Sequence, residues 1–171
     1  MSLGFVIIRV LHILLGAFWA GTLIFNALFL APALAEAGPD GAKVMAAVQR
    51  RRFMDVMPLV ALLTILSGVW LYWRASGGFN AAWSRSPMGM AYGMGGILAI
   101  VAFAIGVGVM RPAMMRAGRI VSQVTQASDP VQRESLMAPL PGLRRRSANA
   151  GRAVALLLAL TVALMAVARY L

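Results

Sequence analysis

Four long apolar runs constrain the fold more than any other feature of this sequence. They cover residues 5–30, 56–73, 88–110 and 153–171. About 20 helical residues cross the hydrocarbon core of a bilayer, and only helices or closed barrels satisfy their backbone there. The runs lack the alternation of barrel strands. The sequence therefore predicts an all-α integral membrane protein, a bundle of four transmembrane helices forming one domain over residues 1–171.

The composition agrees with a lipid environment. Hydrophobic residues make up 61% of the chain and the mean hydropathy is +0.81, against roughly 45–50% apolar residues in soluble domains. The lipid bilayer is thus the first expected partner. The absence of cysteine excludes disulfides, thiolate metal sites and cysteine nucleophiles.

The formal charge of +11 is concentrated in two connections, residues 31–55 and 111–152. The first holds Lys43, Arg50, Arg51 and Arg52, and the second holds Arg111, Arg116, Arg119, Arg133, Arg144, Arg145, Arg146 and Arg152. The other side holds only Arg9, Arg74, Arg85 and Arg169. The positive-inside rule then places both termini in the periplasm and both connections in the cytoplasm of a bacterial inner membrane. Because topology explains the charge, we do not expect nucleic-acid binding.

The second connection carries a helix-start signal. Asp129 precedes Pro130, an N-cap followed by proline at the first helical position, and Gln132 suits a capping box. We expect a short amphipathic helix that Pro139 and Pro141 bring to an end. The sequence shows no internal repeat.

Polar residues of the first run share one face. Arg9, His12 and Asn26 fall on a stripe with Gly16, Trp19 and Leu23 at spacings of three and four. Ionisable side chains inside a membrane usually point into the bundle. The stripe is a candidate functional face. The simpler interpretation is that His12 and Asn26 are hydrogen-bonding links between helices and that Arg9 reaches the interface.

Methionines suggest a soft-metal site. Met90 and Met94 lie one turn apart at the outer end of the third run, in the leaflet predicted for His12. Thioether and imidazole ligands suit Cu(I), so the three residues are candidate ligands for copper. Methionine is also common packing material in apolar cores.

Small residues mark candidate helix contacts. They are Gly16 and Ala20 in the first run and Gly89, Gly93 and Gly96 in the third. Such spacing lets membrane helices approach closely.

Catalytic groups are scarce. The predicted spans hold no carboxylate beyond Asp55 at a helix start, and one histidine alone cannot give bis-histidine haem ligation. A non-enzymatic protein is therefore the favoured expectation.

Several short motifs resemble small membrane proteins related to the copper-resistance protein D superfamily. They are Leu11-His12, Gly16 to Gly21 (GAFWAG), Leu63 to Trp70 (LTILSGVW) and the closing Ala163 to Leu171 (ALMAVARYL). The resemblance implies a four-helix unit with a histidine in the first helix and copper or haem as cofactor. Related bacterial protoporphyrinogen oxidases pair that histidine with a lysine in a later membrane helix, whereas the only lysine here, Lys43, lies in a connection.

Two interpretations follow. In the first, the protein handles copper or haem through His12. In the second, it is a non-catalytic accessory subunit, either a homo-oligomer or part of a larger respiratory, photosynthetic or transport complex, held through its small-residue faces.

Overall fold

The computed structural model describes residues 2–171, and within that range every regular element is a helix. Four helical stretches are long and apolar enough to cross a membrane: Leu3–Glu36, Phe53–Ala75, Pro87–Gln126 and Pro130–Tyr170. This confirms the all-helical, four-span expectation, so the chain is a multi-pass membrane protein.

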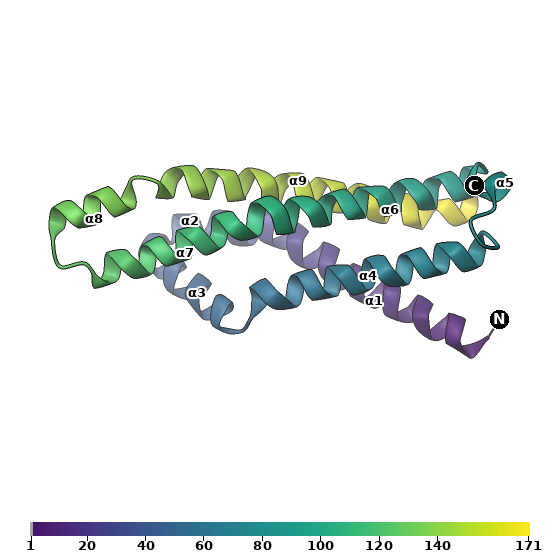
Figure 1. The fold of residues 1–171 in the computed structure, drawn as a ribbon, viewed down its shortest axis with the longest axis horizontal. Coiled ribbons are helices and arrows are strands. Elements are labelled where there is room, and N and C mark those ends of the chain that lie inside the picture. Colours follow the sequence, from purple (N-terminus) through teal and green to yellow (C-terminus); the bar gives the residue numbers. More distant parts are fainter. Residues whose placement is uncertain (1) are drawn as a thin grey trace.

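The stretches consist of successive helical segments. In chain order these are α1 (Leu3–Phe25), η1 (Asn26–Leu30), α2 (Ala31–Glu36), α3 (Gly38–Arg50), α4 (Phe53–Ala75), α5 (Ala81–Ser84), α6 (Pro87–Ile105), η2 (Gly106–Met110), α7 (Arg111–Gln126), α8 (Pro130–Met137), α9 (Leu140–Val167) and η3 (Ala168–Tyr170). Both chain ends lie at the end of the molecule opposite α8 (Figure 1). We call the end that carries α3, α7 and α8 the basic end.

The two basic connections are themselves mostly helical. Helix α7 continues α6, and α9 begins at Leu140, well before its membrane-spanning part. Together with α8 they extend the bundle at the basic end (Figure 1). Helix α8 starts where the sequence predicts, because the Asp129 carboxylate accepts the N–H of Val131 at 3.1 Å as an N-cap.

The bundle is built from two hairpins. Helix α1 packs against α4 and α6 packs against α9, and each first helix also touches the second helix of the other hairpin. Small side chains such as Ala61 and Ala102 let the four helices meet in a narrow core. The core also includes the larger side chains of Trp19, Val154 and Leu158.

The first helix of each hairpin continues into a π turn ahead of a proline, α1 into η1 and α6 into η2. The residue before the proline bonds to the carbonyl five residues back, Ala31 to Asn26 in η1 and Arg111 to Gly106 in η2. In a regular α-helix, the rings of Pro32 and Pro112 would press on the carbonyl four residues back. The wider π turn relieves that clash and lets both helices continue.

The hairpins are also related in sequence. Each π turn is followed at the same distance by Pro-Ala, at Pro32 and Pro112. Three arginines precede a shared Val-Ala-Leu-Leu at the same distance in both hairpins, at residues 60–63 and 154–157. The arginines come just before α4 in the first hairpin and lie in the early part of α9 in the second. The first Val and Ala of both copies are buried. The chain therefore contains two similar hairpins, and the expectation of no internal repeat was wrong because apolar helices share much of their composition whether or not they are related.

Corresponding residues make related contacts between the helices. Ser67 of α4 corresponds to Thr161 of α9, and each reaches across its own hairpin. The Ser67 hydroxyl lies 3.1 Å from His12 Nδ1 on α1, and the Thr161 hydroxyl donates to the Gly95 carbonyl of α6 at 3.3 Å. The counterpart of His12 itself is Tyr92. Only the first hairpin therefore has an imidazole at this position.

Candidate functional site

His12 lies on the face of α1 that packs against α4. Its Nδ1 atom is 2.9 Å from the Thr64 carbonyl oxygen and 3.1 Å from the Ser67 hydroxyl oxygen. A carbonyl oxygen can only accept, so the contact with Thr64 is a hydrogen bond only if Nδ1 carries a proton. The ring is thereby tied to the backbone of the neighbouring helix.

Protonation at Nδ1 leaves the other ring nitrogen free to bind a ligand. In a neutral imidazole with Nδ1–H, the Nε2 atom holds a lone pair. The Ser67 hydroxyl lies 2.7 Å from the Leu63 carbonyl and 2.9 Å from the Thr64 carbonyl, so it can donate along its own helix and still accept from His12. Metal-binding histidines commonly donate one N–H to a carbonyl, which fixes the tautomer and ring orientation.

Gly68 makes room for the imidazole. A Cβ atom at this position would lie 2.8 Å from His12 Cε1 and 3.4 Å from Nδ1. The absence of a side chain at Gly68 therefore allows the ring to sit against α4. The sequence gives Gly68 no role beyond its place in the LTILSGVW motif, although a glycine directly after Ser67 in a mostly apolar helix is a signal that could have found it.

The two candidate methionines lie elsewhere. Met90 and Met94 are 53% and 54% exposed, and their helix α6 packs mainly against α9 and α4 rather than α1. Within residues 2–171 there is also no group of three or more histidine, cysteine or carboxylate side chains arranged to hold a metal. The structure therefore brings His12 together with Thr64, Ser67 and Gly68, and leaves both methionines on an outer surface.

The other residues of the predicted stripe take different positions. Trp19 and Leu23 are buried in the core, while the Arg9 side chain is exposed. Asn26 is half-buried and opens the π turn η1. The middle of the stripe faces the bundle, and its charged end does not.

The small residues divide in the same way. Ala20 is buried, and a Cβ atom on Gly16 would lie 3.4 Å from the Thr64 side chain. Gly89 is buried against the backbone of Trp83, and Gly93 faces the Tyr72 ring. A Cβ atom on Gly96, in contrast, would meet nothing within 4 Å.

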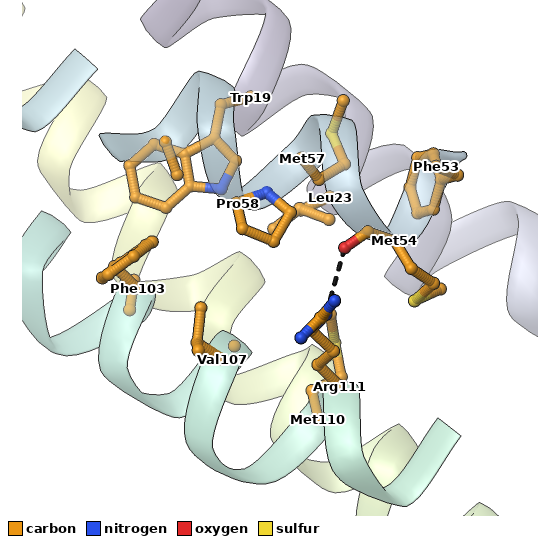
Figure 2. A pocket seen from close by; sticks show the side chains of 13 residues that line it. Trp19, Leu23, Phe53, Met54, Met57, Pro58, Phe103, Val107, Met110 and Arg111 are labelled. Carbon is orange, nitrogen blue, oxygen red and sulfur yellow. Dashed lines mark hydrogen bonds between the residues drawn. The ribbon is translucent and has the colours of Figure 1, made fainter. Parts of the chain in front are cut away.

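A second feature is an apolar cleft near the basic end. It has a volume of about 40 Å³ and is open on one side. Its walls come from α1, α4, α6 and η2 and include the aromatic rings of Trp19, Phe53 and Phe103 (Figure 2). Among the described residues that line it, Arg111 alone is charged.

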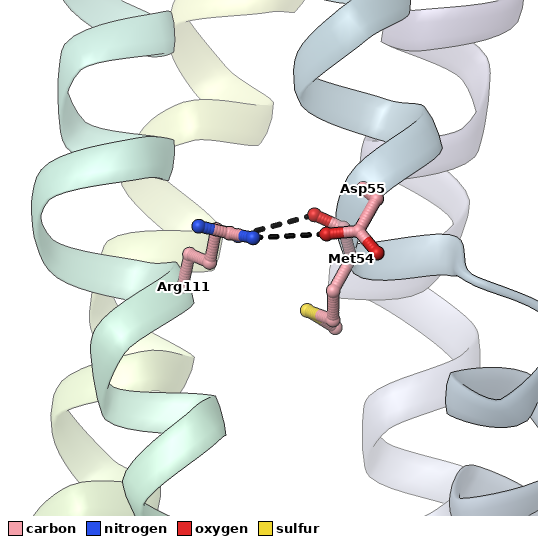
Figure 3. Close-up of polar contacts among 3 residues, drawn as sticks. All are labelled: Met54, Asp55 and Arg111. Carbon is pink, nitrogen blue, oxygen red and sulfur yellow. Dashed lines mark hydrogen bonds and ion pairs between the residues drawn. The ribbon is translucent and has the colours of Figure 1, made fainter.

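Arg111 joins two elements at the mouth of this cleft. Its Nε donates to the Met54 carbonyl at 3.2 Å, and its Nη2 donates to the Asp55 carboxylate at 2.9 Å (Figure 3). Both acceptors lie in the first turn of α4, whereas Arg111 begins α7 directly after the π turn. The sequence pointed to neither the cleft nor this pair.

Comparison of the chain with protein-family models, with curated proteins and with solved structures found no match.

Proposed function

We propose that this protein binds haem or copper in a bacterial inner membrane, with Nε2 of His12 as the protein ligand. The observation that carries the proposal is the pair of contacts from His12 Nδ1 to Thr64 and Ser67. They hold the imidazole in the tautomer and orientation that a ligand requires, next to a glycine that leaves space for the ring.

Haem fits these residues better than a copper ion held within one chain. A haem iron can be held by one histidine on the protein side, and His12 supplies that contact alone. Cu(I) calls for further soft ligands, yet Met90 and Met94 sit on the exposed face of another helix. Haem would supply redox chemistry when bound, and His12 would hold and orient it.

The orientation belongs to the same proposal. The connections that carry most of the arginines face the cytoplasm, and both termini face the periplasm. His12 then lies in the outer half of its helix, within reach of compounds that arrive from the periplasmic side.

The test is the visible absorption and metal content of the full-length protein, purified in a mild detergent after growth with added haem precursor or copper. We expect a Soret band or about one equivalent of metal, lost in His12→Ala. Tyr92→Phe changes the corresponding position of the other hairpin and should keep full occupancy. Circular dichroism should give the same helix content for all three proteins.

A colourless, metal-free protein after both supplements would contradict the proposal. The function would then be that of an accessory subunit, a role favoured by the first half of α1. There His12 already links two helices, and apolar side chains stay exposed on most sides, namely Leu3, Val6, Ile7, Val10, Leu11, Ile13 and Leu14. Stoichiometric co-purification of a membrane partner through α1 would support that role.

A further inference from the structure

We propose that the cleft near the basic end binds one anionic phospholipid, with its phosphate on Arg111 and an acyl chain along the aromatic walls. The site lies at the opposite end of the bundle core from His12 and does not depend on metal or haem binding. Four properties of the described residues lead to it.

The first property is the chemistry of the cleft. The walls are apolar side chains, and the single charge stands at the end that faces the basic connections. A half-open cleft of about 40 Å³ holds only a short part of an acyl chain, so most of the chain would lie along the open side of the cleft. A ligand that matches is amphiphilic, apolar over most of its length and anionic at one end.

The second property is the state of Arg111. Its contacts with Met54 and Asp55 use one N–H on Nε and one on Nη2. A guanidinium has five N–H donors in a rigid plane, so three stay free after these bonds. The first contacts hold the guanidinium in place, and the free donors suit a phosphate, which arginine binds in a two-pronged manner.

The third property is the local charge. The Asp55 side chain is 65% exposed, so solvent weakens its compensation of Arg111. Arg50, Arg51 and Arg52 directly precede α4 and add three positive charges at the same end. Clusters of arginine beside a membrane helix attract anionic lipids, so the surroundings favour an anionic headgroup over a zwitterionic one.

The fourth property is the difference between the two hairpins. Trp19, Phe53 and Arg111 correspond by position to Ala99, Ser147 and Ala31. The large aromatic walls and the guanidinium are therefore present on one side of the bundle only. A cleft formed by packing of two similar hairpins alone would not concentrate these residues on one side.

The π turn η2 forms part of the cleft wall. Gly106 lines it, and a Cβ atom there would meet nothing within 4 Å. A Cβ atom on Gly108, two residues later, would also meet nothing within 4 Å, but Gly108 does not line the cleft. This pair allows the cleft to be filled, or left open, by the same substitution in the same turn.

The experiment is native mass spectrometry of the full-length protein in mild detergent, titrated with phosphatidylglycerol or with phosphatidylcholine of the same acyl chains. We expect one phosphatidylglycerol to remain bound to the wild-type protein and to bind at least about tenfold more tightly than phosphatidylcholine, because a charge-assisted contact is worth about that much. Arg111→Gln should abolish the preference for phosphatidylglycerol. Gly106→Leu should weaken the binding of both lipids, because the leucine side chain fills the cleft.

Two control variants complete the test. Arg119→Gln removes an exposed charge from α7, and Gly108→Leu adds the same bulk outside the cleft; both should bind as the wild type does. Equal loss in Arg111→Gln and Arg119→Gln would overturn the site in favour of general surface charge. Unchanged binding in both Arg111→Gln and Gly106→Leu would overturn it entirely. If Arg111→Gln unfolds, the comparison of the two glycine variants still decides.

Discussion

At the residue scale, the contact between His12 and Gly68 sets how closely α1 approaches α4. The imidazole lies against the α4 backbone because position 68 has no side chain, and its Nδ1 atom reaches the Thr64 carbonyl one turn earlier. The histidine is therefore both the proposed ligand and part of the helix contact, and an added methyl group at position 68 affects both.

We predict that Gly68→Ala destabilises the protein. The added Cβ atom would stand 2.8 Å from His12 Cε1, so the ring must move or the helices must separate. Overpacking of this kind costs about 1–3 kcal/mol. Thermal unfolding in detergent should show a lower midpoint, and any haem or metal bound through His12 should be lost as well.

Gly21→Ala is the matched control for this prediction. It lies in the same helix as His12, and a Cβ atom there would meet nothing within 4 Å. Its stability should stay the same or rise by up to about 1 kcal/mol, since alanine favours the helix. Similar losses in both variants would show that the space beside His12 has no special role.

Part of this site could be predicted from the sequence. His12, Gly16, Trp19 and Leu23 follow a helical period, which places them on one face whatever the partner helix. Thr64, Ser67 and Gly68 could not be assigned to that face, because no periodicity says which helix α1 meets or at what height. Met90 and Met94 share a face of their own helix, but the packing of α6 turns that face outward.

At the element scale, the two basic connections hold more helix than the one short amphipathic helix that the sequence predicts. Charge marks where the membrane ends, but arginine, alanine and glutamine are good helix formers in water. Helix α8 ends at Met137, just before Pro139, as the sequence predicts. The helices continue past Pro32 and Pro112, because the π turn before each of them makes room for the ring. Apolar length therefore predicts the crossing segments well and the helix ends poorly.

Arg111 of α7 bonds to the Met54 carbonyl and to the Asp55 carboxylate of α4. We predict that losing one or both of these contacts lowers the free energy of unfolding by different amounts. Asp55→Asn removes only a partly exposed ion pair, worth about 0.2–1 kcal/mol. Arg111→Gln also removes the bond to the Met54 carbonyl and should cost about 1–3 kcal/mol. Unfolding by dodecyl sulfate in lipid-free mixed micelles would measure both. Equal losses would mean that the Met54 contact contributes nothing.

At the scale of the whole molecule, four crossings bring both termini to one side, as Figure 1 shows. The assignment of one side to the cytoplasm comes from the distribution of charge. That assignment depends on the arginines at the basic end and on the positive-inside rule.

We predict that the basic end is cytoplasmic. The chain has no cysteine, so single-cysteine variants can be labelled without background. Arg85→Cys, in the short connection near the termini, should react with a membrane-impermeant maleimide in intact cells. Gln132→Cys in α8 should react only after permeabilisation. Leu160→Cys, within the span of α9, should stay unlabelled, and the reverse pattern for the first two would invert the topology.

The two similar hairpins have a consequence for the history of the chain. A unit with two crossings returns to the side from which it started, so a tandem copy inserts in the same orientation and needs no inversion. A single-hairpin ancestor could thus have paired as a symmetric dimer before its gene was duplicated and joined. In such a dimer every substitution occurs twice. Only after fusion can corresponding positions carry different residues, such as Trp19 and Ala99 or His12 and Tyr92. Two equivalent surfaces can then become two different surfaces.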